Sequence, residues 1–559
     1  MKSDIEIAQE AKVQNIVDIA KKIGLSADDL EQFGKYVAKV PLDVLDRIGK
    51  DKKNGKLILV TAVTPTPAGE GKTVTTISLI EGLHAIGKNV VGALREPSMG
   101  PTFGVKGGAT GGGNVQVYPM WKIDLEFTGD IHAVAAAHNL LSAVLENNLV
   151  RDNPLNIDPT RIVWKKTVDM NCRELRKIIV GLGDNKLNAG VPHESGYLIT
   201  SASEISAILA LSKDYADLRK RLERIVVAYT YDKKPVTAGQ LGCVGAMMVI
   251  LREALMPNLV QTLEGQPVFI HGFPFANIAH GNNSIIATKA AVKLGDYAVT
   301  EGGFAADLGA EKFMDIVCRQ SDIRPDCVVL VATVRALMHH GGADVKDPST
   351  LTAEALERGF ANLDKHIENM RSYGAPVIVS INHFAFDDPA HMDMIRKHCE
   401  KMGVEVAQND GFLEGGKGAV ELAEKVVKIV DNTKTDFKFC YPDDAPVKEK
   451  IKAVATKIYG ADDVVYSAAA EQSLKALEEQ GYGKLPICIA KTQYSISDKA
   501  DLRAAPKGWK LEVREVNLSA GAGFIIPVCG AIMLMPGLGK VPAAMNIDLT
   551  DDGKIIGLH

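Results

Sequence analysis

The chain has 559 residues, of which 46% are hydrophobic and 24% are charged, and its formal net charge is −5. This length exceeds what one hydrophobic core supports, so we expect about three domains. Basic and acidic residues are interspersed without a basic stripe, which argues against nucleic acid as the main partner.

The N-terminal residues predict an amphipathic helix that begins with a capping box formed by Ser3 and Glu6. This stretch has no apolar core of the length that a signal peptide needs. The most apolar later stretch, FIIPVCGAIMLMPG, is interrupted by Pro527 and Gly530 and is too short to cross a bilayer. We therefore expect a cytoplasmic protein with no membrane partner. The eight cysteines are scattered and form no CxxC pair, so neither a disulfide framework nor a zinc site is predicted.

The stretch TPTPAGEGKT, residues 64–73, lies between the apolar run LILVTAV and the helical pattern TTISLIEGLHAIG. A strand, a glycine-rich turn and a helix are typical of a phosphate-binding loop, in which Lys72 contacts the β/γ oxygens and the Thr73 hydroxyl binds Mg²⁺. Thr66 replaces the first glycine of the usual GxxxxGK[ST] pattern, and an ordinary strand–helix turn is the alternative. The predicted nucleotide-binding residues are Thr66, Pro67, Ala68, Gly69, Glu70, Gly71, Lys72 and Thr73.

Short apolar runs alternate with helical patterns through the first two-thirds of the chain. They are LILVTAV, NVVGAL, RIVVAYTY, PVFIHGF, DYAVTEG, CVVLVAT and PVIVSIN. Such runs are typical of strands that are buried on both faces of a parallel sheet. We predict an α/β fold with a doubly wound, mostly parallel sheet of the P-loop NTPase type and two smaller α/β or α+β domains. The expected domains are a nucleotide-binding unit at 1–364, a middle unit at 365–455 and a C-terminal unit at 456–559.

Residues that follow the strand ends are the first candidates for a site, because ligands of such sheets bind beyond the carboxyl ends of the strands. Arg95 follows NVVGAL, where its guanidinium can hold a phosphate or a carboxylate; an ordinary surface arginine is the alternative. Residues 104–114 contain six glycines and Lys106, a pattern that suits an anion-binding loop better than a flexible linker. Asp130 is the expected N-cap of the next helix.

Acidic and aromatic side chains give further candidates. Glu301, Asp307 and Glu311 can hold Mg²⁺ or cap helices, and the sequence leaves these alternatives open. Phe384 and Phe412 are expected in loops of the middle domain, where they can stack on a planar ligand or pack in the core.

Several of these motifs, in order and almost from end to end, closely resemble the formate–tetrahydrofolate ligase family. They are TPTPAGEGKT, LREPSMGPTFGVKGGATGGG, FTGDIHAV, FIHGFPFANIAHG, GGFAADLGAEKF, VATVRAL, AKTQYSISD and MPGLGKVPAAMNID. The resemblance implies activation of formate by ATP to formyl phosphate, and attack by an amine of tetrahydrofolate to give 10-formyltetrahydrofolate, ADP and phosphate. It also implies Mg²⁺, a monovalent cation (K⁺ or NH₄⁺) and a homotetramer.

The resemblance also implies roles for individual residues. Lys72 and Arg95 would be catalytic, and Thr73 would bind the metal. Phe384 and Phe412 would enclose the pterin. The residues implied for formate and the pterin together are Arg95, Lys106, Glu126, Phe304, Phe384 and Phe412.

The chain departs from the family pattern at Thr110, Asn114, Glu126, Phe273, Met338 and Phe412. Glu126 replaces a histidine and Met338 a basic residue, and both changes lower the positive charge expected near formate. The leading interpretation is the ligase. A sibling ligase with another acid or another acceptor, such as dihydrofolate, is one alternative, and a nucleotide-dependent, non-enzymatic P-loop protein is the other.

Overall fold

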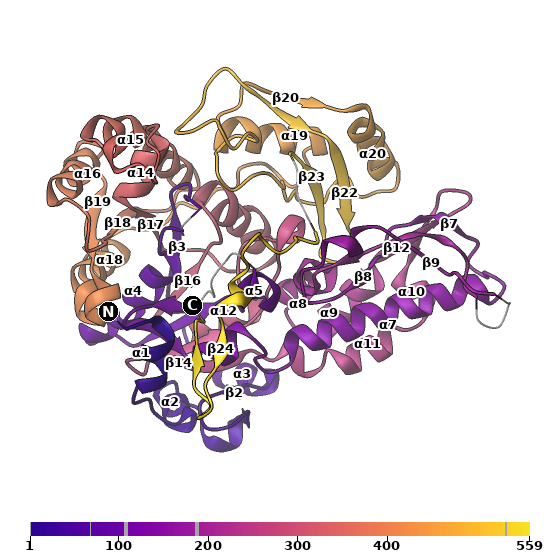
Figure 1. The fold of residues 1–559 in the computed structure, drawn as a ribbon, viewed down its shortest axis with the longest axis horizontal. Helices are drawn as coiled ribbons and strands as arrows, with labels where there is room; N and C mark the ends of the chain where they lie inside the picture. The colour runs from indigo at the N-terminus through magenta and orange to yellow at the C-terminus, as the bar shows by residue number, and fades with distance from the viewer. Residues whose placement is uncertain (1, 68, 105–109, 185–188, 531–533, 559) are drawn as a thin grey trace.

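A computed structural model of the chain describes residues 2–67, 69–104, 110–184, 189–530 and 534–558. Three parts are visible in Figure 1: a body around a large sheet, an arm that contains α7 (Asp130–Val150), and a C-terminal unit that contains β22 (Glu515–Ser519) and β23 (Phe524–Val528). The arm and the C-terminal unit both extend from the body.

The large sheet has the strand order β1-β2-β14-β15-β4-β16-β3-β17-β18-β19, in which β1 is Glu31–Gln32 and β2 is Ala38–Lys39. Its neighbours from β15 to β19 pair in parallel, whereas β14 (Asn258–Thr262) pairs antiparallel with β15. The parallel strands are β15 (Pro267–Ile270), β4 (Val90–Leu94), β16 (Tyr297–Glu301), β3 (Lys56–Ala62), β17 (Cys327–Ala332), β18 (Val377–Asn382) and β19 (Glu405–Asn409). The prediction of an α/β protein with a mostly parallel sheet is confirmed.

The sheet is buried on both faces. Along β3, Leu57 and Leu59 belong to one hydrophobic cluster, while Ile58 and Val60 belong to another. Apolar residues of α4 (Lys72–Ala85) and α18 (Val420–Asn432) pack in the second cluster. Those of α12 (Ile285–Leu294), α14 (Val334–His340) and α15 (Ala353–Ser372) pack in the first. Burial on both faces explains why these strands are continuous apolar runs.

One expected strand belongs elsewhere. RIVVAYTY forms β12 (Val226–Thr230), which pairs antiparallel with β13 (Pro235–Thr237) and β7 (Ile157–Ile162) in the arm. The prediction that it joins the parallel sheet is wrong, because a short apolar run indicates a strand but not its partners.

The large sheet continues past the predicted start of the middle unit. The predicted boundary at residue 364 lies within α15, and β18 and β19, which follow it, continue the same sheet as β3. Phe412, expected in a loop, lies in the short helix α17 (Gly411–Glu414). The division into three domains stays a prediction.

Two helix starts test the capping predictions. The capping box of Ser3 and Glu6 is formed at α1 (Asp4–Glu10). The N-cap of α7 is Gly129, so the prediction of Asp130 as the cap is wrong. The Asp130 carboxylate instead accepts hydrogen bonds from the buried Lys39 ammonium at 2.7 Å and from the Asn258 amide at 2.8 Å. The buried Lys39 ammonium needs a negatively charged partner, so the Asp130 carboxylate pairs with it and does not cap the helix.

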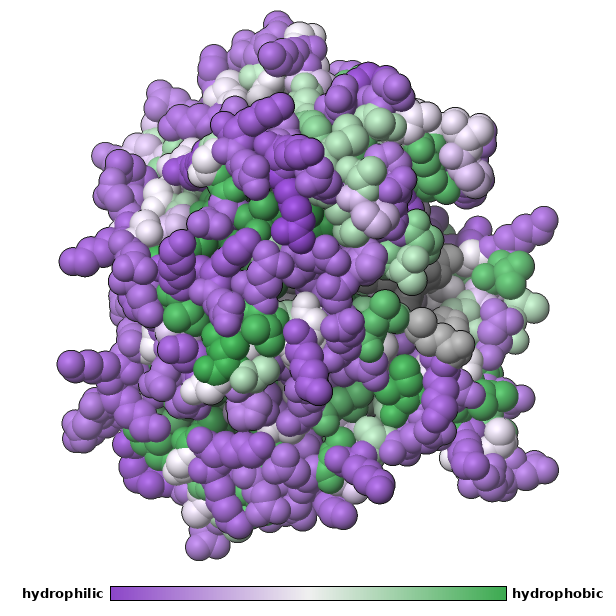
Figure 2. Space-filling view, turned by 90° about the vertical axis from the view of Figure 1, so that its left-hand side faces the viewer, coloured by the Kyte–Doolittle hydropathy of each residue, from purple (hydrophilic) through white to green (hydrophobic). Residues whose placement is uncertain are grey.

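Figure 2 shows one face of the molecule, on which hydrophilic residues predominate and hydrophobic patches are small and separate. Within the described residues, no helix has the length and apolarity needed to cross a membrane. All eight cysteines lie in the described part of the chain and are free thiols.

Candidate active site

The glycine-rich turn connects β3 to α4. Gly69 and Gly71 have φ values of 80° and 67°, in the left-handed region that favours glycine. Gly71 is the N-cap of α4 and provides no capping side chain, which leaves N–H groups of the first turn free to bind an anion. A Cβ atom on Gly71 would lie 2.2 Å from Nδ2 of Asn382, at the end of β18, so a larger residue there would displace the Asn382 side chain. Ala68 lies outside the described residues.

The buried Glu70 side chain stabilises the turn through hydrogen bonds. Its carboxylate accepts hydrogen bonds from the Thr66 N–H at 2.6 Å and from the Thr333 hydroxyl. Burial raises the pKa of Glu70. Asn382 Nδ2 donates to the Glu70 carbonyl oxygen at 3.3 Å. Glu70 therefore shapes the loop through its side chain, and its predicted nucleotide contact would come from the backbone.

Lys72, Arg95 and Glu301 form a charged cluster beside the turn, because β3, β4 and β16 are neighbours and end at the same edge of the sheet. Burial lowers the pKa of Lys72, and the nearby Arg95 lowers it further while Glu301 opposes both. Burial also lowers the pKa of Arg95, again opposed by Glu301. The Arg95 guanidinium donates to the Pro274 carbonyl oxygen at 3.4 Å. Two cations and one carboxylate give this edge a net positive charge that suits phosphate.

The Thr73 hydroxyl donates to Glu301 Oε2 at 3.0 Å, and Glu301 is 4% exposed. A hydroxyl and a buried carboxylate at the start of α4 are hard oxygen donors that fit Mg²⁺. The other two acidic candidates fit less well. Asp307 is already paired with Lys491 at 2.7 Å, and burial raises the pKa of Glu311 to about 8. Of the three alternatives left open by the sequence, Glu301 is the one that contacts the loop.

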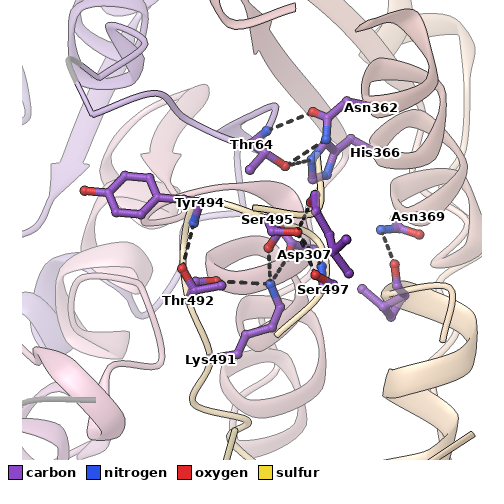
Figure 3. A network of polar contacts seen from close by, with 12 residues as sticks. Thr64, Asp307, Asn362, His366, Asn369, Lys491, Thr492, Tyr494, Ser495 and Ser497 are labelled. Carbon is purple, nitrogen blue, oxygen red and sulfur yellow. Dashed lines mark hydrogen bonds and ion pairs between the residues drawn. The ribbon is translucent and has the colours of Figure 1, made fainter. Parts of the chain in front are cut away.

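A buried polar network lies where the C-terminal segment meets the loop (Figure 3). Lys491 Nζ donates to the Ser495 carbonyl oxygen at 2.6 Å in addition to its pair with Asp307. Thr64, at the start of the turn, contacts His366 Nε2 at 2.9 Å, and burial lowers the pKa of that histidine to about 4. The segment AKTQYSISD thus pairs with Asp307, and the start of the turn is held by α15; the sequence indicated neither contact.

The three predicted pterin residues lie at separate strand ends. Phe304, just after β16, has a φ of 60°, which is unusual for a bulky side chain and is concentrated at functional sites. The half-buried Phe384 follows β18, and its ring stacks on Phe386 with centroids 5.5 Å apart. The Arg335 guanidinium lies 5.5 Å from the centroid of the Phe384 ring. Phe412 lies in α17, after β19.

Asn114 connects Phe412 to the glycine-rich segment. The Asn114 N–H donates to the Phe412 carbonyl oxygen at 3.0 Å, and Asn114 Nδ2 donates to the Leu413 carbonyl oxygen at 2.6 Å. A Cβ on Gly113 would meet the Phe412 carbonyl oxygen at 2.3 Å. The departure at Asn114 therefore fixes the helix that carries Phe412. Lys106 lies outside the described residues.

The remaining departures differ in accessibility. Glu126 is exposed, and it adds to the effect of burial in raising the pKa of Asp169. Thr110 is buried, whereas Phe273 and Met338 lie in the main hydrophobic cluster. The loss of positive charge expected at Met338 thus concerns a position in the core, while Glu126 lies at the surface.

A glycine turn at the start of a buried helix, with two cations and a carboxylate beside it at one edge of a parallel sheet, defines an α/β protein with a site whose charge suits an anion. The model of the family described as formate--tetrahydrofolate ligase matches residues 2–559. The chain belongs to this family, which confirms the resemblance. It is therefore an ATP-dependent ligase of one-carbon metabolism acting on formate and tetrahydrofolate, and the alternative of a non-enzymatic P-loop protein is set aside.

Proposed function

We propose that the protein transfers the γ-phosphoryl group of ATP to formate and then the formyl group to tetrahydrofolate, with 10-formyltetrahydrofolate, ADP and phosphate as products. Formate is a poor electrophile, and phosphorylation turns one of its oxygens into a leaving group. The turn before α4 would hold the phosphates in the manner of a P-loop.

The observation that carries this proposal is the cluster of Lys72 and Arg95 beside Glu301 at the start of α4. Phosphoryl transfer depends mainly on positioning and on neutralising the charge of the phosphate oxygens. Lys72 suits the β/γ oxygens, and the planar guanidinium of Arg95 suits formate and then its mixed anhydride with phosphate. Phe304, Phe384 and Phe412 would line the pterin site.

Thr73 and Glu301 are the residues that would hold Mg²⁺, directly or through water. When bound, Mg²⁺ would neutralise charge on the phosphate oxygens. The proposal also includes a monovalent cation, K⁺ or NH₄⁺, and a homotetramer.

The test is ADP release by the purified protein with Mg-ATP and a potassium salt, with and without formate, and with tetrahydrofolate or dihydrofolate in parallel. Formation of 10-formyltetrahydrofolate, measured by absorbance after acid cyclisation, supports the proposal. ADP release that needs formate but not tetrahydrofolate would place the change in the acceptor. No response to formate would refute formyl phosphate formation.

A further inference from the structure

A histidine–carboxylate pair lies at the carboxyl ends of β18 and β19. His383 Nδ1 and Asp410 Oδ1 are hydrogen-bonded, and the two side chains are 21% and 26% exposed. The two strands pair in parallel with Asn382 opposite Asn409, so the next residue on each strand belongs to this pair. His383 Nε2 has no hydrogen-bond partner among the described residues.

Hydrogen bonds from neighbouring residues fix the position of the Asp410 carboxylate. Gln408 Nε2 donates to both Asp410 oxygens, at 3.2 and 3.0 Å, and the Arg396 guanidinium donates to Gln408 Oε1 at 3.1 Å. The Asp410 N–H donates to the Gly418 carbonyl oxygen at 3.0 Å. A fixed carboxylate that accepts a hydrogen bond from Nδ1–H leaves the lone pair of the neutral imidazole on Nε2.

The neighbours of the pair along the chain include residues that contact the glycine-rich turn or α4 and two of the proposed pterin residues. One residue before the pair on each strand, Asn382 donates to the Glu70 carbonyl oxygen at 3.3 Å and Asn409 donates to Thr75 Oγ1 in α4 at 3.2 Å. Phe384 comes directly after His383, and Phe412 follows two residues after Asp410. A ligand that reaches from the turn to these residues would therefore lie near the carboxyl ends of β18 and β19, where His383 is located.

The other charged groups around His383 come from the loop after β18 and from α14. Asp387 accepts a hydrogen bond from the Phe384 N–H at 2.9 Å. Burial raises the pKa of Asp387, whereas this hydrogen bond and the nearby His383, Arg335 and His391 lower it. Arg335 lies beyond the Phe384 ring. Asp410 is the one carboxylate among the described residues that bonds to the imidazole. The environment therefore combines an orienting carboxylate with an accessible ring nitrogen.

We propose that His383, positioned by Asp410, is the general base of formyl transfer. The inference depends on the proposed function. The acceptor amine of tetrahydrofolate forms a C–N bond to the formyl carbon, the bond from that carbon to the phosphate oxygen breaks, and phosphate leaves with the electron pair. The amine proton passes to His383 Nε2, and no oxidant or reductant is needed.

The test separates the two half-reactions. A rapid-quench single turnover with Mg-ATP and formate, without pterin, measures ADP formed on the enzyme, and addition of tetrahydrofolate measures formyl transfer. In His383→Gln we expect transfer about 10²–10³-fold slower, while ADP formation stays within about threefold of the wild type. Imidazole added to His383→Ala should restore part of the transfer rate.

The chain offers a matched control in His398, whose Nε2 contacts Asp364 Oδ1 at 2.6 Å in a pair with exposures of 22% and 34%. His398 also stacks on Phe360, but it lies on α16 (Pro389–Lys401). His398→Gln should keep both half-reactions. Asp410→Asn should slow transfer by about tenfold and move the acidic limb of its pH–rate profile to lower pH, since the carboxylate that stabilises imidazolium is lost.

The outcomes are distinct. A wild-type protein that forms no formylated folate refutes the proposed function and this inference with it. A wild-type protein that transfers formyl while His383→Gln transfers it equally fast refutes the base alone. A higher KM for tetrahydrofolate at an unchanged single-turnover rate would also refute the base, because it would make His383 a binding residue. Thermal unfolding midpoints exclude misfolding, and if His383→Gln does not fold, the pH profile of Asp410→Asn decides.

Discussion

Gly71→Ala should weaken ATP binding through two separable effects. The first is backbone strain, because an L-residue in the left-handed region, here at φ 67°, costs about 1–2 kcal/mol. The second is displacement of Asn382, whose Nδ2 would lie 2.2 Å from the new Cβ. Moving that amide breaks its hydrogen bond to the Glu70 carbonyl oxygen, which contributes about 1 kcal/mol.

Gly69→Ala is the matched control, because Gly69 has a φ of 80° and its Cβ would meet nothing within 4 Å. When the free loop of the variant relaxes and ATP binding has to restore the left-handed conformation, strain alone corresponds to a rise of about 5- to 30-fold in the Kd for Mg-ATP, and both effects together to about 30- to 150-fold. Calorimetric titration gives the two Kd values, and unfolding midpoints show whether the fold is intact. Removing the amide in Gly71→Ala/Asn382→Ala should remove the clash but not the hydrogen-bond loss. Equal Kd values for the two alanine variants would refute the argument from Asn382.

Three further predictions concern charge. Burial and the nearby Glu264 raise the pKa of Glu81 to about 8 from its ordinary 4.5, so the folded state holds a proton that the unfolded state releases between these values. The free energy of unfolding should therefore fall as pH rises over that range, by about 1.4 kcal/mol per pH unit, and urea titrations should show a flatter profile for Glu81→Gln. Lys39→Met should destabilise the protein by about 3–5 kcal/mol in the same assay, and adding Asp130→Asn should recover part of the loss, because the buried pair is removed as a whole. Glu301→Gln should raise the Mg²⁺ concentration needed for half-maximal turnover about 10–100-fold, and an unchanged requirement would exclude Glu301 from the metal site.

Much of the sheet could be predicted because strands that are buried on both faces consist of continuous apolar residues, as LILVTAV does in β3. The positions of Lys72 and Arg95 could also be predicted, since Arg95 follows such a run directly and Lys72 follows the glycine-rich turn after one. The residues at the ends of other strands that contact the loop or the helix after it could not be predicted. Thr333 and Asn382 reach the loop and Asn409 reaches α4 because β17, β18 and β19 follow β3 in that order across the sheet, and strand order is not encoded in any local pattern. The prediction that RIVVAYTY joins the parallel sheet was wrong for the same reason.

The pair of Asp307 and Lys491 has a consequence for how the protein is made. Both side chains are almost fully buried, and a carboxylate left in that environment without its cation is strongly unfavourable. A chain still on the ribosome exposes the loop, β4 and β16 long before residue 491 has been synthesised. The pair is therefore completed only near the end of translation, so a nascent chain that stops short of this lysine leaves the Asp307 carboxylate without its cation and should not pack around Asp307 as the whole chain does.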